Sequence, residues 1–177
     1  MHRLLPNKLG ALGVLLTDAI ETAIGEHSPS AASLLLTLHY SGPMTATALA
    51  AIGGITQPTA VRVTGRLIRL GLIKRQGYSG RSAPLRLTST GIEHARALQR
   101  ARLLAMTHLV AGLSKTERTG LERVLDKILE DATSSRGFAR TTCRLCDHSV
   151  CTGRLCPIGA KATSLDRQER FPQRRKK

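Results

Sequence analysis

Apolar residues recur at three- and four-residue steps along much of the chain, which is the spacing of amphipathic helices. The first apolar stripe consists of Leu5, Leu9, Leu12, Leu16 and Ile20. This stripe predicts a helix over residues 3–24. A second predicted helix begins at Ser28, has Pro29 in its first turn and stops near Gly42.

The next part of the pattern is that of two short helices joined by a tight turn. Residues 45–52 predict a short helix, and Gly53-Gly54 provides the turn. A second helix is predicted over 56–70, with a threonine cap and a proline in its first turn. Two short helices in this order hold the second one away from the body of the protein.

Alternating and glycine-bounded residues then predict a hairpin of two strands, 72–76 and 84–87. Two longer amphipathic helices follow, one from about residue 88 to 111 and one over 114–132. Ser114 and Glu117 have the spacing of a capping box at the start of the last helix.

Taken together, these elements predict a mainly α protein with a small β-hairpin wing, that is, a winged helix-turn-helix. We expect the following division: a winged-helix domain over 1–132 with its core at 28–88 and flanking helices at 1–25 and 89–132, a polar linker at 133–142, a cysteine-rich segment at 143–157 and a basic tail at 158–177.

Charge adds a function class to this fold, because the chain of 177 residues has a formal net charge of +15. Ten basic residues and one acid, Glu93, lie between positions 57 and 102, whereas residues 114–131 carry five acids and four basic residues. Such a one-sided distribution indicates a polyanionic partner. The four aromatic residues are too few for a protein that stacks single-stranded bases.

The major groove of duplex DNA admits one helix, whose N-terminal residues meet the base edges. Gln57 can pair with adenine through two hydrogen bonds, whereas Arg62 is better placed for phosphates. A guanidinium at the hairpin tip, Arg81, suits a narrow minor groove. The predicted DNA-binding residues are Thr45, Thr56, Gln57, Thr59, Val61, Arg62, Arg66, Arg69 and Arg81.

Residues 1–132 resemble the MarR family of winged-helix regulators. The residues that carry this resemblance are Met44-Thr45, Leu49-Ala50, Gly54 to Pro58, Arg62, Arg66-Leu67, Leu70 to Ile73, Leu85 to Thr88, Gly91 and Leu113 to Arg118. The resemblance implies a homodimer that interlocks through its first and last helices and reads a pseudo-palindromic site. It also implies a transcriptional regulator, usually a repressor, that can respond to a small-molecule effector. One position departs from the family pattern, since Ser79 replaces the acid that usually precedes the tip arginine.

All four cysteines of the chain, Cys143, Cys146, Cys151 and Cys156, lie within a short segment. Four thiolates at this spacing suit one tetrahedral zinc ion, as in a zinc knuckle. An iron–sulfur cluster is the alternative to zinc, because the pair Cys156-Pro157 also ends the cysteine runs of iron–sulfur ferredoxins. Thiol redox sensing without a metal is a third interpretation, because Arg144 and Arg154 favour thiolates. The cysteines are therefore expected to bind a metal or to sense redox state.

Other function classes fit the sequence less well. The apolar run near the N-terminus is interrupted by Pro6, Asn7 and Lys8, and no segment has the length to span a membrane. We therefore expect a cytoplasmic protein. No acid, base or cofactor loop accompanies the thiols, so we expect no enzyme. A nonspecific architectural protein that uses the basic tail remains an alternative to the regulator.

Overall fold

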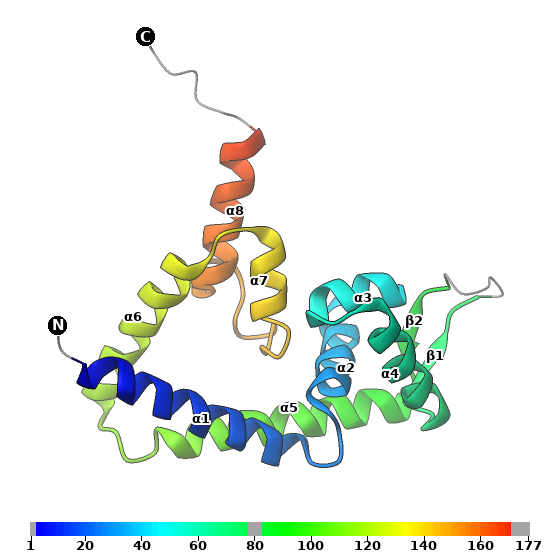
Figure 1. Cartoon of the computed structure of the whole chain (residues 1–177), viewed down its shortest axis with the longest axis horizontal. Coiled ribbons are helices and arrows are strands. Elements are labelled where there is room, and N and C mark those ends of the chain that lie inside the picture. The colour runs from blue at the N-terminus through cyan, green and yellow to red at the C-terminus, as the bar shows by residue number, and fades with distance from the viewer. Residues whose placement is uncertain (1–2, 78–82, 171–177) are drawn as a thin grey trace, which may run out of the picture.

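The computed structural model describes residues 3–77 and 83–170 (Figure 1). Its elements, in chain order, are α1 (Leu4–Ile24), α2 (Pro29–Ser41), α3 (Ala46–Gly53), α4 (Gln57–Arg69), β1 (Ile73–Arg75), β2 (Leu85–Leu87), α5 (Ser89–Leu109), α6 (Lys115–Ala132), α7 (Arg136–Thr142), the 3₁₀ helix η1 (Gly153–Leu155) and α8 (Pro157–Arg170). The fold is therefore mainly helical with a small hairpin wing, as the sequence predicts.

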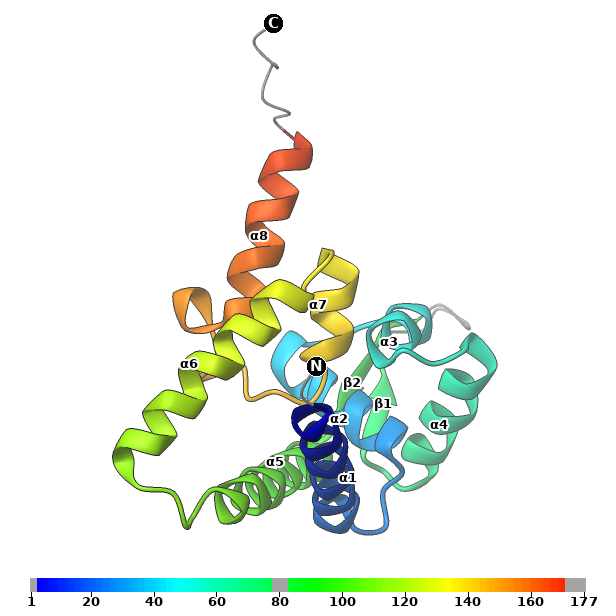
Figure 2. The same ribbon diagram turned by 60° about the vertical axis from the view of Figure 1, so that its left-hand side comes forward.

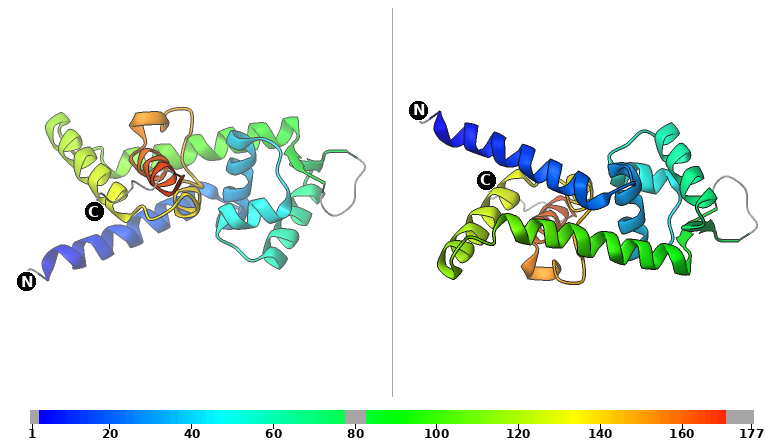
Figure 3. Two further views of the ribbon diagram at one scale, coloured as in Figure 1. Left: turned by 90° about the horizontal axis from the view of Figure 1, so that it is seen from above. Right: turned by 90° about the horizontal axis from the view of Figure 1, so that it is seen from below.

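The two long helices α1 and α5 lie side by side and form one edge of the molecule (Figures 1 and 3). The winged helix occupies the end of this edge where α1 stops and α5 begins. At the other end, α6 turns away from α5 and rises toward α7 and α8 (Figure 1). The flanking helices thus place the winged helix at one end and leave much of α1 and α6 uncovered.

The main core surrounds α2, whose residues from Ala31 to Leu38 are all buried. Ser28 caps this helix by accepting a hydrogen bond from the Ala31 N–H, at 3.2 Å. Against α2 pack buried side chains from α3, α4, both strands and α5, namely Leu49, Leu67, Ile73, Leu85, Ala95 and Leu98. A core of leucine, isoleucine and alanine explains how the domain packs with so few aromatic residues.

The wing is an antiparallel pair in which Ile73 faces Leu87 and Arg75 faces Leu85. A single bridge between Met44 and Leu85 joins it to the segment before α3. At the base of the wing, α5 approaches Leu72 so closely that a Cβ on Gly91 would lie 1.9 Å from the Leu72 carbonyl oxygen. The sheet and α5 are therefore locked together at a position that only glycine fits.

Residues 133–142 are more ordered than a linker, because α7 occupies most of the segment. Ser135 caps α7 by accepting a hydrogen bond from the Phe138 N–H, at 3.1 Å. Much of the expected basic tail is likewise helical and forms α8. Ala139 of α7 packs against Ile158 and Ala162 of α8. The sequence did not predict this apolar contact, because both segments consist mostly of polar residues.

The α8 helix packs on α6 and α7 and extends away from the winged helix (Figure 2). Residues 133–170 thus form a small C-terminal module of two helices connected by the cysteine loop, which we define as residues 143–156. No helix within residues 3–77 and 83–170 has both the length and the apolar character needed to cross a membrane.

Candidate nucleic-acid interface and cysteine loop

The α4 helix has one buried face and one basic face. Ala60, Thr64 and Leu67 are buried against the core. The remaining surface exposes Val61, Arg62, Arg66 and Arg69 to solvent. This helix therefore presents to its surroundings the arginines that the sequence predicts for DNA phosphates.

The start of α4 is fixed by its cap, since Thr56 accepts a hydrogen bond from the Thr59 N–H at 3.4 Å. The hydroxyls of these two threonines are also hydrogen-bonded, at 2.9 Å. Gln57 is exposed, and its Nε2 donates to Thr47 Oγ1 of α3 at 2.8 Å. Three of the predicted contacts thus gather at the end of the helix that would enter a groove, and Thr47 is a partner that the sequence alone did not indicate.

Thr45 has a structural task in addition to any contact with DNA. It is the N-cap of α3, and its Oγ1 accepts a hydrogen bond from the Ala48 N–H at 3.2 Å. Its side chain is only partly exposed. The cap holds α3 at the angle that presents α4.

The wing adds further basic residues beside α4. Lys74, Arg75 and Arg86 are exposed on its two strands. These three residues belong to the basic stretch of the sequence but are not among the predicted DNA contacts. Arg81 and the unusual Ser79 lie outside the described residues.

Comparison with known proteins matches this part of the chain to one family. Residues 28–82 fit the model of the MarR family, and this range spans α2, α3, α4 and β1. This segment matches the winged helix of the MarR family. Among curated proteins, no match to the chain was found.

Several solved structures have the same fold. A MarR family protein from Bacillus stearothermophilus superposes with a TM-score of 0.65 at 20% identity, covering 73% of this chain and 94% of its own. For MepR, a transcription regulator of the Staphylococcus aureus multidrug efflux pump MepA, the TM-score is 0.60 at 21% identity, with coverages of 74% and 98%. The Mycobacterium tuberculosis MarR family protein RV2887, in complex with salicylic acid, gives 0.55 at 23% identity, with coverages of 68% and 92%.

Nearly the whole length of each of these structures superposes on this chain. About a quarter or more of this chain, however, has no counterpart in them. The MarR-type winged helix is therefore one part of the molecule. The chain's four cysteines lie outside the segment that fits the family model.

The four cysteines line one cavity of about 370 Å³ in the C-terminal module. Within it, Cys143 lies next to Cys146, and Cys151 lies next to Cys156. Cys156 is buried, and its Sγ accepts a hydrogen bond from the Gly159 N–H at 3.2 Å, at the start of α8. The fold thus gathers the thiols that the sequence predicts to act together, as two contacting pairs.

The environment makes the first pair of thiols unequal. The hydrogen bond from Cys143 and the positive charges of Arg102 and His148 lower the pKa of Cys146 to about 6, against the opposing effect of burial. The hydrogen bond to Cys146, together with burial, raises the pKa of Cys143.

The thiols are not arranged as a finished metal site. Within residues 3–77 and 83–170, no three or more histidine, cysteine, aspartate or glutamate side chains are grouped so as to hold a metal ion. An ion could bind in this cavity only if the two pairs of thiols moved toward each other.

The C-terminal module is attached to the rest of the molecule at three places. The Tyr40 ring of α2 stacks on His148, with centroids 5.3 Å apart and planes at 14°, and its hydroxyl is hydrogen-bonded to Asp147. Burial and this bond raise the pKa of Tyr40 to about 12. On α5, the buried Gln99 amide, oriented to satisfy both partners, donates to the Leu145 carbonyl (3.3 Å) and accepts from the Asp147 N–H (3.0 Å).

The third attachment joins α7 to the helix-turn-helix itself. Thr141 Oγ1 donates to the Ala51 carbonyl of α3 at 3.4 Å, and its methyl group lies beside Gly54 in the turn. Leu145 packs against the main core. None of these contacts follows from sequence spacing, because each joins residues at least 40 positions apart along the chain.

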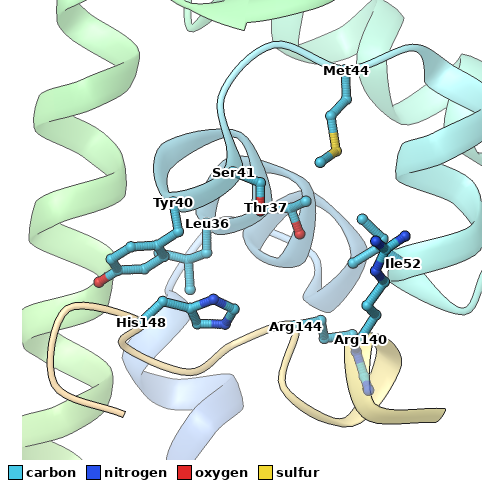
Figure 4. A pocket seen from close by; sticks show the side chains of 9 residues that line it. All are labelled: Leu36, Thr37, Tyr40, Ser41, Met44, Ile52, Arg140, Arg144 and His148. Carbon is cyan, nitrogen blue, oxygen red and sulfur yellow. The ribbon is translucent and has the colours of Figure 1, made fainter. Parts of the chain in front are cut away.

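A second cavity, of about 230 Å³, lies at this junction (Figure 4). Tyr40 and His148 stand at one side of it, and Arg140 and Arg144 extend from the module (Figure 4). The apolar part of its wall comes from Leu36, Met44 and Ile52. The cavity therefore combines cationic side chains with an apolar wall.

Proposed function

We propose that this protein is a transcriptional regulator, and most simply a repressor, that binds duplex DNA sequence-specifically. The observation that carries the proposal is the exposed face of α4, where Arg62, Arg66 and Arg69 stand in line beside the basic wing. A DNA-binding regulator acts where the chromosome is, so we place it in the cytoplasm. We do not propose an enzymatic activity.

In this proposal α4 enters the major groove from its N-terminal end. Gln57 exchanges its hydrogen bond with Thr47 for hydrogen bonds to a base edge, and Thr59 and Val61 contact a thymine methyl group. The arginines of α4 contact phosphates, which fix the register without reading the sequence. Arg81 of the wing reaches the adjacent minor groove.

We further propose that the protein acts as a homodimer. Large apolar side chains are exposed along α1, α5 and α6, and nothing within residues 3–77 and 83–170 covers them: Leu4, Leu5, Leu9, Leu12, Val14, Leu15, Leu103, Leu104, Leu109, Val124, Leu125 and Ile128. Exposed apolar surface of this extent is typical of an interface. A second copy that covers it places two α4 helices about one helical turn of DNA apart, roughly 34 Å, on a pseudo-palindromic site.

We place the reception of the signal in the C-terminal module and at its junction with the winged helix. The cysteine loop supports a metal or redox signal, because its thiols are gathered in one cavity. A small-molecule effector is the second candidate signal, since the related RV2887 forms a complex with salicylic acid. The junction cavity, with Arg140 and Arg144 in its wall, would suit a small organic anion. Either signal regulates DNA binding only if it favours one dimer state over another.

The test is a salt titration of binding to an operator-containing duplex and to a random duplex of equal length. The operator is first selected from random sequence by the full-length protein. A regulator binds its operator at least about 1,000-fold more tightly than random DNA at physiological salt. Comparable affinities for both duplexes would replace this proposal with a nonspecific architectural role.

A further inference from the structure

We propose that the cysteine loop binds one zinc-class divalent ion through its four thiolates, and that this ion fixes the C-terminal module against the helix-turn-helix. The metal site stands on the module alone. Its effect on DNA binding rests on the function proposed above.

The ligand chemistry is that of a soft, thiol-preferring ion. Cys143, Cys146, Cys151 and Cys156 line one cavity, and no aspartate or glutamate is among the residues that line it. All four thiols therefore open onto the same space. An ion that replaces the thiol protons draws the two pairs together, because thiolates bind zinc at about 2.3 Å in a tetrahedral set.

The backbone around Cys156 is arranged to support a thiolate. Cys156 directly precedes α8, a helix of 14 residues, and its Sγ receives the Gly159 N–H. The basic side chain of Arg140 also lines the cavity. Thiolates in this cavity therefore have the start of α8 and a guanidinium group nearby.

A bound ion would also stabilise the module itself. Its core consists of Ala139, Cys156, Ile158 and Ala162, with Leu129 of α6 packed against it. Arg136 and Asp166 form a salt bridge between α7 and α8, but both side chains are more than one third exposed. Small units with so little apolar core are usually held together by metals or disulfides.

The same loop carries the contacts that reach the winged helix. Cys146 lies between Leu145 and Asp147, which are the two residues that the Gln99 amide holds. Asp147 and His148 contact Tyr40 of α2, and Cys143 directly follows α7, whose Thr141 touches Ala51 and Gly54. If Cys143 and Cys146 move, the contacts of the loop therefore shift α2, α3 and α5 together. Because α3 positions α4, such a movement also changes the placement of α4.

The first experiment measures metal binding by the full-length protein. Protein purified without oxygen is analysed for elemental content, and apoprotein competes with a chromogenic chelator for Zn²⁺. We expect one zinc per chain and, after exchange with Co²⁺, the sulfur-to-metal absorption of a four-thiolate site. Cys143→Ser and Cys156→Ser should each lose this site, whereas Ser149→Ala, in the same loop, should retain it.

Three outcomes would overturn the metal assignment. These are a chain that binds no zinc, cysteine variants that bind zinc like the parent, and a brown iron-containing protein with the absorption of an iron–sulfur cluster. In the first case, formation of disulfides with a hydroperoxide would assign the loop to redox sensing.

The second experiment compares operator affinity of the zinc-loaded and chelator-treated protein. We expect a change of about 5- to 150-fold, the usual range of coupling between two sites. Tyr40→Ala and Gln99→Leu should still bind zinc with the parent stoichiometry but respond less to it. Operator binding that is equally tight with and without zinc would refute the coupling, whereas absence of operator binding in both states would refute the proposed function instead.

Discussion

Gln57 and Arg62 lie at different distances from the start of α4, and their substitution should affect DNA binding in different ways. Gln57 lies in the first turn and is held by Thr47, whereas Arg62 lies farther along the exposed face. Arg62→Ala should weaken binding to operator and random duplexes alike and reduce the salt slope by about one, because one phosphate contact is lost.

Gln57→Ala should instead relax the preference at a single base position, at a cost of about 1–3 kcal/mol for the preferred operator alone. The measurement is binding to a panel of operators with one base pair changed in each. Equal losses for both variants on all duplexes would show that Gln57 reads no base. Thr47→Val, which removes the resting partner of Gln57, tests whether that hydrogen bond competes with DNA.

Gly91 gives the sharpest steric prediction of the molecule. A Cβ at this position would lie 1.9 Å from the backbone oxygen of Leu72, so β1 and α5 must separate. Gly91→Ala should therefore destabilise the fold by about 1–3 kcal/mol in denaturant unfolding. Gly120→Ala in α6, where nothing lies within 4 Å of the added Cβ, should be neutral or stabilising.

At the scale of single elements, the capping box of α6 predicts a pH dependence. Ser114 Oγ accepts from the Glu117 N–H, and Glu117 Oε2 accepts from the Ser114 N–H at 2.8 Å. The hydrogen bonds from the Ser114 side chain and backbone lower the pKa of Glu117. A lowered pKa in the folded state gives stability that is present above the ordinary glutamate pKa and is lost as pH falls through the folded value.

The thermal midpoint of the parent protein should therefore exceed that of Glu117→Gln at neutral pH, and the difference should shrink in acid. Glu122→Gln, on the same helix but outside the box, serves as the control. A difference that stays constant from neutral pH to acid would mean that the charge of Glu117 contributes nothing to the cap.

At the scale of the whole molecule, the exposed apolar faces predict how the chains associate. Leu125 of α6 is 43% exposed and lies in a groove of about 1,010 Å³ between α6 and α8, which Val150 and Leu155 of the cysteine loop extend. Leu125→Glu should shift the solution mass from twice the chain mass of 19.1 kDa toward the chain mass. Lys127→Glu, which places the same charge on the same helix away from the groove, should not.

Light scattering after size exclusion measures this mass, and helical content by circular dichroism shows whether each variant is folded. A folded Leu125→Glu variant that remains a dimer would remove α6 from the interface. A monomeric variant should also lose most of its operator affinity, because one α4 helix alone reads half of the site.

The sequence by itself determined the local structure of this protein. Apolar spacing located the helices, and the capping residues Ser28, Thr56 and Ser114 marked starts that the structure confirms. The basic face of α4 could be predicted from the same periodicity, because residues three or four positions apart lie on the same face of a helix. These features depend on neighbours within a few residues, and so they are already specified along the chain.

Only the tertiary structure decided how the cysteines relate to the winged helix. Residues 133–142 read as a linker because α7 buries little more than Ala139, and that burial exists only against Ile158 and Ala162 of α8. The contacts of Tyr40, Gln99 and Thr141 could not be predicted from the sequence. The role of a polar side chain depends on which distant residues the tertiary packing brings next to it. Packing brings together residues separated by most of the chain, and no local periodicity records which of them will meet.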